Sequence, residues 1–142
     1  MKNLLILVLL GLTTLLISTS CNKDDDDDTI ITVESRDKFI GAYDVKDTTY
    51  NPNPGYHYSS YVMTIAKDPS DTAKIIITNL NNYGVETLAK VTNNIFMITK
   101  QKIGTYYDVS GSGDINGNIL KFDLILDDDH EPKQLYGSGV KK

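Results

Sequence analysis

The chain lacks most of the residue patterns that would identify an enzyme. It has a single cysteine, Cys21, so it can form neither an intramolecular disulfide nor a redox-active pair. It contains no Gly-x-Ser-x-Gly elbow and no His-Glu-x-x-His motif, and its two histidines, His57 and His130, lie far apart in the sequence. Glutamates number only three. We therefore expect no enzymatic activity and no cofactor, although a pair of catalytic carboxylates would depend on geometry that a sequence does not give.

An excess of basic residues, which nucleic-acid binding requires, is also missing. Lysine and arginine together number 14 against 19 aspartates and glutamates, a net charge of −5, and phosphates require a basic face. The acidic residues 127–131 could gather around calcium, but Pro132 follows them and they lack the ligand spacing of a calcium loop. We therefore expect no nucleic-acid partner, no metal site and a solvated hairpin tip at residues 127–131.

Only one apolar run is long enough to matter for targeting, and it occupies residues 4–17 after Lys2. A membrane-spanning helix needs about 20 apolar residues, so this run suits the core of a signal peptide better. A buried helix of the domain is the alternative, but the preceding lysine and the small residues that follow favour the signal peptide. We expect residues 1–20 to be a signal peptide that is removed.

The segment Ser18-Thr19-Ser20-Cys21 resembles the lipobox of bacterial lipoprotein precursors, in which small residues precede an acylated cysteine. The resemblance implies that Cys21 becomes the first residue of the mature protein and carries acyl chains such as palmitate. Each buried methylene contributes about 0.8 kcal/mol, so two or three chains would hold the protein at the membrane durably. We therefore expect the mature protein to be anchored to the membrane through this N-terminal lipid.

An acidic run follows the cysteine and includes Lys23, Asp24, Asp25 and Asp26. Neighbouring aspartates repel one another and bury nothing, so we expect residues 21–32 to be a flexible tether. Lys23 and the acidic residues after it are also similar to the surface-export signal of lipoproteins in one Gram-negative phylum. That resemblance implies display on the outer face of the outer membrane; a plain spacer and a periplasm-facing protein are the alternatives.

The remaining residues, 33–142, are predicted to form one domain made of strands and turns. Phe39, Gly41, Tyr43 and Val45 alternate with residues of the opposite face, which is the period of a strand. Asn116-Gly117 is a strong hairpin signal because a type I′ turn needs positive φ at both positions. Further strands are expected at residues 61–66, 75–80, 85–91, 95–100, 106–115, 119–127 and 133–140. Residues 85–90 could instead form one or two helical turns.

These strands are joined by short turns, so each is expected to pair with its neighbour in the sequence. The fold class predicted is all-β: an antiparallel up-and-down meander of about eight strands. Such a meander most simply closes into a β-barrel, because closure removes the exposed edges.

Three motifs resemble those of the lipocalin family. Residues 38–43, Lys-Phe-Ile-Gly-Ala-Tyr, are similar to the lipocalin opening Lys-Phe-x-Gly-x-Trp, with Tyr43 in the tryptophan position. Residues 75–79 and 113–118 are similar to a strand and a hairpin of small lipocalin-like domains of bacterial lipoproteins. The resemblance implies a lipocalin-like β-barrel whose closed end is plugged by the aromatic residue.

An eight-stranded barrel has room for its own side chains or for one small ligand. Ten residues are available to fill it: Phe39, Tyr43, Met63, Ile65, Ile77, Phe96, Ile98, Phe122, Leu124 and Leu126. A binding site is expected at an open end, near the predicted loop 50–61, whose aromatic residues offer ring faces and hydroxyls. Its candidate residues are Tyr50, Tyr56, His57, Tyr58 and Tyr61. The alternative is that these tyrosines only alternate between the core and the outer face.

Two functions therefore remain open. The first is a lipid-anchored binding module for a small apolar molecule, a glycan or a peptide. The second is an accessory without enzymatic activity, whose barrel is filled and whose outer face meets a protein of the envelope.

Overall fold

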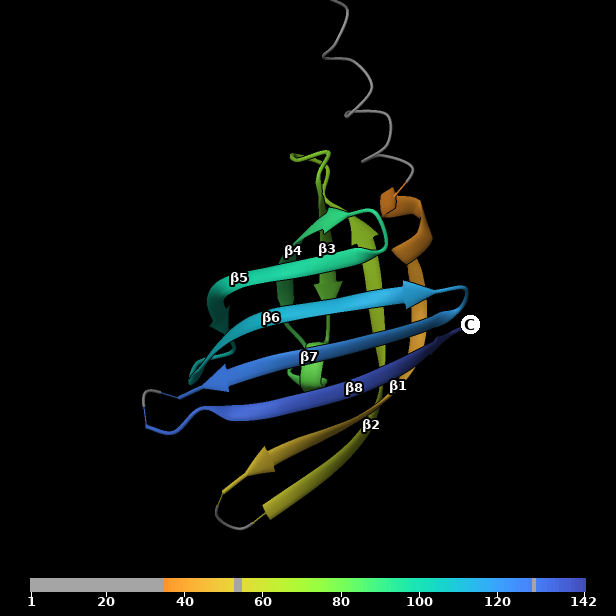
Figure 1. The fold of residues 1–142 in the computed structure, drawn as a ribbon. Helices are drawn as coiled ribbons and strands as arrows, with labels where there is room; N and C mark the ends of the chain where they lie inside the picture. The colour runs from red at the N-terminus through yellow and green to blue at the C-terminus, as the bar shows by residue number, and fades with distance from the viewer. Residues whose placement is uncertain (1–34, 53–54, 129) are drawn as a thin grey trace, which may run out of the picture.

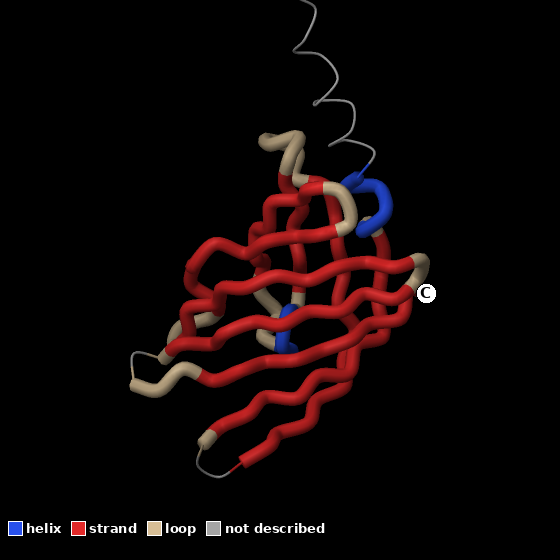
Figure 2. The backbone as a smooth tube through the Cα atoms, in the orientation of Figure 1, coloured by secondary structure: helices blue, strands red, loops and turns tan. Residues whose placement is uncertain are grey.

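The structure, a computed structural model, describes residues 35–52, 55–128 and 130–142. In these residues eight antiparallel strands follow one another around a closed barrel, and the last strand pairs with the first (Figure 1). A helical turn at residues 35–39 precedes the barrel, and the 3-10 turn η1 (Leu80–Asn82) follows the third strand (Figure 2). The strands are β1 (Gly41–Asn51), β2 (Gly55–Lys67), β3 (Lys74–Thr78), β4 (Glu86–Thr92), β5 (Ile95–Ile103), β6 (Tyr107–Asn116), β7 (Ile119–Asp127) and β8 (Lys133–Lys141).

The two-residue period of the sequence explains why these strands enclose a core. In β7, for example, the even-numbered residues from Leu120 to Leu126 are buried while Lys121 and Asp123 are exposed. All ten residues expected to fill the interior are buried, so that prediction and the all-β barrel are confirmed. The segment that could have been helical, residues 85–90, lies almost entirely in β4.

Two predictions about the chain path are wrong. The turn after β6 is made by Gly117 and Asn118, because Asn116 still pairs with Ile119, and of these residues only Gly117 has a positive φ, so the predicted type I′ turn at Asn116-Gly117 is not formed.

Residues 50–61 do not form a loop, because β1 continues to Asn51 and β2 begins at Gly55, so only the tip of this hairpin turns. Aromatic residues favour strands, and the rings of Tyr50 and Tyr56 pack across the hairpin with centroids 5.1 Å apart. The pairing of β1 with β2 continues as far as Asn51 and Gly55, and these two strands extend below the rest of the barrel in Figure 1.

The end of the barrel near residues 35–39 is closed by packed aromatic rings. Phe39 lies in the helical turn and not in a strand, and its ring contacts Phe96 edge to face at 6.0 Å. The hydroxyl of Tyr43 donates a hydrogen bond of 2.7 Å to the carbonyl oxygen of Phe39. Burial raises the pKa of Tyr43 to about 12, so this hydroxyl stays protonated as a donor. Tyr43 thus joins the first strand to the turn that covers it.

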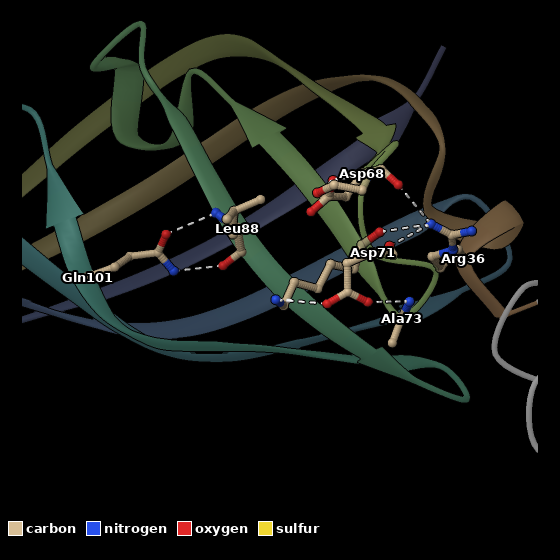
Figure 3. A network of polar contacts seen from close by, with 8 residues as sticks. Arg36, Asp68, Asp71, Ala73, Leu88 and Gln101 are labelled. Carbon is tan, nitrogen blue, oxygen red and sulfur yellow. Dashed lines mark hydrogen bonds and ion pairs between the residues drawn. The ribbon is translucent and has the colours of Figure 1, made fainter.

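Arg36 fastens the same turn to the loop between β2 and β3. Its side chain is 5% exposed, and its Nη1 donates to the carbonyl oxygens of Asp68, Asp71 and Lys74 at 3.1–3.3 Å (Figure 3). A guanidinium has several donors in a fixed plane and can therefore satisfy carbonyls that the sheet leaves unpaired. The buried Arg36 guanidinium therefore holds the helical turn over this end of the barrel by hydrogen bonds to backbone carbonyls.

Two glycines make room for the aromatic rings of the core. Gly113 and Gly137 lie opposite Phe122 on the strands to either side of it. A Cβ atom at Gly137 would come within 2.0 Å of the Phe122 ring, and one at Gly113 within 2.3 Å of the Phe96 ring. Any other residue at these positions would displace a ring.

The junction of β4 and β5 is held partly by a side chain. Backbone pairing between these strands covers only Lys90 to Thr92, and the pairing of β5 with β6 shifts between Ile98 and Gln101. At Leu88, outside this paired stretch of β4, the side-chain amide of Gln101 replaces the backbone of the partner strand. Its Oε1 accepts from the Leu88 N–H at 3.0 Å and its Nε2 donates to the Leu88 carbonyl at 2.7 Å (Figure 3). The barrel is therefore closed here by an amide that replaces a backbone pair.

Candidate functional site

The inward-facing residues change from apolar to polar along the first two strands. In β1 the inward positions hold Tyr43 and Val45 near the closed end and then Asp47 and Thr49. In β2 they hold Ile65 and Met63 near the closed end and then, farther away, tyrosine, serine and histidine. The half of the barrel away from residues 35–39 therefore has a polar interior.

A pocket of about 340 Å³ occupies this polar mouth. Its lining comes from the β1–β2 hairpin, the segment between β3 and β4, and the near ends of β6, β7 and β8. We call it the mouth pocket, and its residues are Thr49, Asn51, His57, Ser59, Asn81, Asn82, Tyr83, Tyr107, Leu126 and Lys133. Only Leu126 among them is aliphatic, and the volume lies at the lower end of the range for small-molecule sites, roughly 300–1,000 Å³.

A buried carboxyl group lies beside the pocket wall. Asp47 is 3% exposed, and the Tyr61 hydroxyl donates to its Oδ2 at 2.6 Å. The same hydroxyl accepts from the Asn81 N–H at 2.9 Å, so Tyr61 links β1 to the η1 turn. Oδ1 of Asp47 has no hydrogen-bond partner among the described residues. Burial raises the pKa of Asp47 even though the Tyr61 hydrogen bond opposes the rise.

Three asparagines between β3 and β4 have a left-handed backbone. Their φ values are 68° at Asn79, 51° at Asn81 and 61° at Asn82. Asparagine tolerates this region better than most residues, but the conformation still costs free energy. The Asn79 amide fixes the turn, because its Nδ2 donates to the Val62 carbonyl and its Oδ1 accepts from the Gly84 N–H, both at 2.8 Å. Asn81 and Asn82 are thereby held at the pocket, and strained backbone of this kind is concentrated at functional sites.

The opposite wall of the pocket is an aromatic and charged cluster. The rings of Tyr83 and Tyr107 lie 5.6 Å apart, and the Lys133 ammonium lies 4.9 Å from the centre of the Tyr107 ring. Lys133 also pairs with Asp128 at 2.6 Å, which lowers the pKa of Asp128 to about 2. Burial, followed by the influence of Tyr107, raises the pKa of Tyr83 to about 12. At neutral pH this wall therefore presents the neutral hydroxyl of Tyr83 and one paired cation.

The residue types of a hydrolytic triad meet near the pocket without forming one. Asp47 lies opposite Ser59, and His57 lies one inward position farther along β2. Tyr61 donates the hydrogen bond of 2.6 Å to the Asp47 carboxylate, and within residues 35–52, 55–128 and 130–142 no hydrogen bond joins His57 to Ser59 or Asp47. Over the same residues, no three histidine, cysteine, aspartate or glutamate side chains are grouped so that they could hold a metal ion.

The structure separates the five predicted site residues. His57 lines the mouth pocket, and Tyr61 lies inside the barrel as its link to Asp47. Tyr50, Tyr56 and Tyr58 point to the outer face and are 40%, 65% and 75% exposed. The predicted lipidation and export residues, Cys21, Lys23, Asp24, Asp25 and Asp26, lie outside the described residues.

Sequence reasoning missed most of the pocket. Asp47 could have been noticed, because it is a charged residue at an inward position of a strand whose preceding inward residues, Tyr43 and Val45, are largely apolar. Asn81 and Asn82 fall in the connection between the predicted strands 75–80 and 85–91, and Tyr107 and Lys133 are distant in sequence from the hairpin. Only the closed barrel brings them together.

Comparison with known proteins does not assign the chain to a family. No protein-family model matches it, and no curated protein matches it. Among the described residues, no helix has both the length and the apolar character needed to cross a membrane.

Proposed function

We propose that this protein is a lipid-anchored binding module that captures a small polyhydroxylated molecule, the size of a sugar, in the mouth pocket. One observation supports this most directly: the closed half of the interior is filled by apolar side chains, while the mouth keeps a pocket of about 340 Å³ lined by amides, hydroxyls, an imidazole and an ammonium. An apolar ligand would leave those polar groups unpaired, which is costly, whereas a sugar-like ligand would satisfy them.

The proposed setting is the bacterial outer membrane, with attachment through acylated Cys21. The lipobox resemblance of residues 18–21 and the run of Lys23 and aspartates support anchoring and surface display. Protease added to intact cells should release the domain from the wild type, and a Cys21→Ala variant should not incorporate radiolabelled palmitate. Protection of the domain in intact cells, with cleavage only after lysis, would contradict outward display.

The proposal is for binding without catalysis, and its ligand test uses nuclear magnetic resonance. The full-length protein would be purified in a polyoxyethylene detergent, because sugar-headed detergents would compete. Saturation-transfer spectra would then be recorded with a panel of monosaccharides and polyols. We expect transfer to at least one member, with the signal reduced in Asn82→Gly and His57→Ala.

Tyr106→Ala is the matched control, because Tyr106 is 76% exposed and does not line the pocket. Its signal should equal that of the wild type. Transfer to no member of the panel, or a signal that both pocket variants leave unchanged, would refute the proposed site. Excess mass on the protein isolated from its producing cells, seen by native mass spectrometry and lost on denaturation, would identify the natural ligand.

The accessory alternative would use the outer surface instead. Val62, Val140 and Ile119 are exposed on one outward row, with Asp44 between the two valines. Asp44 pairs with Lys142 at 2.9 Å, so an ion pair interrupts the apolar surface. We favour the binding module because the polar pocket is continuous and this surface is not.

A further inference from the structure

The outer wall of the barrel carries a second concave surface, which shares only Ser59 with the lining of the mouth pocket. A groove of about 550 Å³ runs over β2, β1, β8 and β7. Most of its lining residues point outward, among them Lys46, Thr48, Tyr58, Ser60, Tyr136 and Ser138, while the inward-facing, buried Asp47 also borders the groove. Tyr58 and Tyr136 are 75% and 44% exposed, so both side chains are accessible from the solvent.

Strand register arranges these six residues in two adjacent rows. Thr48 of β1 pairs with Tyr58 of β2 on one side and with Tyr136 of β8 on the other. Two residues along β1, Lys46 pairs in the same way with Ser60 and Ser138. We call these six residues the outer array: one row has a ring on each side of a threonine, and the other has a hydroxyl on each side of an ammonium.

Lys46 is available to an anion from outside the chain. Six of the described lysines, such as Lys67 and Lys74, form ion pairs with aspartates. Among the residues that the structure describes, Lys46 has neither an ion pair nor a side-chain hydrogen bond, and the same holds for Lys90 and Lys121.

Lys121 also borders the groove, but Asp114 lies opposite it and Asp123 lies beside it on the same face. The cross-strand neighbours of Lys46 are uncharged serines, and the aspartate beside it on the same face, Asp44, is already paired with Lys142, so Lys46 is the better site for an anion. The net negative charge of the protein acts against an anionic ligand, but charges farther than the Debye length of about 8 Å are largely screened at physiological salt.

The spacing of the rings and the cation fits a sugar chain that bears carboxylates. Tyr58 and Tyr136 lie two strands apart, which places their Cα atoms roughly 9–10 Å from each other. Ring faces of tyrosine pack against the C–H face of a pyranose, and an ammonium flanked by hydroxyls binds a carboxylate through charge-assisted hydrogen bonds. We propose that the outer array binds an acidic oligosaccharide, with its rings on Tyr58 and Tyr136 and a carboxylate at Lys46, Ser60 and Ser138.

This site is independent of the function proposed for the mouth pocket. The experiment is a calorimetric titration of the full-length protein, in the same detergent, with an oligogalacturonate of defined length. A fully methyl-esterified oligogalacturonate of equal length is the second probe, because it has the same rings without the charge. We expect binding of the acid and at least about threefold weaker binding of the ester, since exposed ion pairs are weak individually.

Variants separate the two parts of the array. Tyr58→Ala and Tyr136→Ala should each weaken binding of the acid about fivefold, and Lys46→Gln about threefold. The Lys46→Gln variant should bind acid and ester equally. Controls are Tyr106→Ala and Lys90→Gln, which remove a similarly exposed tyrosine and another unpaired lysine outside the groove, and Asn82→Gly in the mouth pocket. All three should bind as the wild type does.

Three results would overturn the proposal. The first is no binding of the acid, and the second is equal binding of acid and ester by the wild type. The third is a loss in the controls as large as the loss in the array variants. Because the array is exposed, unchanged circular dichroism and melting temperature are expected for every variant, so a loss of binding would report the site and not the fold. None of these results depends on whether sugars bind in the mouth pocket.

Discussion

The closed half and the open half of this barrel are built from the same strands but differ in what fills them. Near residues 35–39 the interior is packed with rings and aliphatic side chains, and Arg36 holds the covering turn. Toward η1 the inward positions hold polar groups, a buried carboxyl and left-handed asparagines. Backbone pairing continues through both halves, because β1 pairs with β2 as far as Asn51.

This difference indicates that residues for folding stability and residues for binding can lie in different halves of one sheet. Apolar burial supplies most of the folding free energy, so the closed half should dominate stability. The open half can keep strained or poorly paired groups because the shared strands hold it in place. Substitutions in the closed half should therefore change the free energy of unfolding more than substitutions in the open half.

Phe96→Ala should have the largest effect, because it empties a fully buried position between Phe39 and Gly113. Deletion of a buried phenylalanine costs about 3–5 kcal/mol of unfolding free energy. Urea unfolding followed by circular dichroism measures the change. Ile95→Ala, at the neighbouring exposed position, is the control and should change stability by less than about 1 kcal/mol. Similar losses in both variants would argue against a packed closed half.

Arg36→Met should be the next largest, because it keeps the apolar stem of the side chain and removes the donor to three carbonyl oxygens. Hydrogen bonds to charged groups contribute about 1.5–3 kcal/mol, so a loss of about 2 kcal/mol is expected in the same unfolding assay. Lys38→Met, which removes only an exposed hydrogen bond to Asn94, should cost less than about 0.5 kcal/mol. Equal effects would mean that Arg36 does not hold the turn.

Asp47→Asn should act in the opposite direction and raise stability at neutral pH by less than either loss above. Burial raises the pKa of Asp47 above its ordinary 3.8, so the folded state binds this proton more tightly than the unfolded state does. The Asp47 contribution is fully present below pH 3.8 and is lost as the pH rises through the folded pKa. Asparagine removes this dependence and can still accept the Tyr61 hydrogen bond.

Unfolding measured from pH 3 to pH 8 tests this prediction. The gain from Asp47→Asn should grow as the pH rises through the folded pKa and should vanish at the acid end. A loss of stability at pH 7, or a gain that does not change with pH, would show that the ionised Asp47 carboxylate does not destabilise the folded protein.

Asn82→Gly should have the smallest effect on stability, within about 0.5 kcal/mol. Glycine relieves the strain at φ 61° but makes the unfolded chain more flexible, and these two contributions nearly cancel. The same change removes an amide from the mouth pocket, so binding should weaken while the melting temperature stays constant. A large loss of stability would mean that the asparagine side chain supports the fold.

Much of the fold could be predicted from sequence, because the alternation of buried residues such as Phe122, Leu124 and Leu126 is visible within a single short stretch of the chain. The prediction failed at residues 55–61, where the nearby Pro-Gly tip concealed a strand that continues on both sides. The candidate site was harder, because side-chain direction depends on register. Tyr58 and Tyr61 differ by three positions, so they lie on opposite faces of the wall, one outside and one bonded to Asp47.

The position of the helical turn also determines at which end of the barrel an N-terminal anchor would be attached. The described chain enters the barrel at its closed end, and β8 ends at that same end (Figure 1). Under the proposed attachment through Cys21, the tether would therefore join the barrel at the end opposite its mouth. The mouth pocket would lie at the end of the barrel farthest from the point of attachment, and the outer array would lie on the side wall between the two ends. A soluble molecule could then enter through the mouth while a long polymer lies alongside, and neither would block the other.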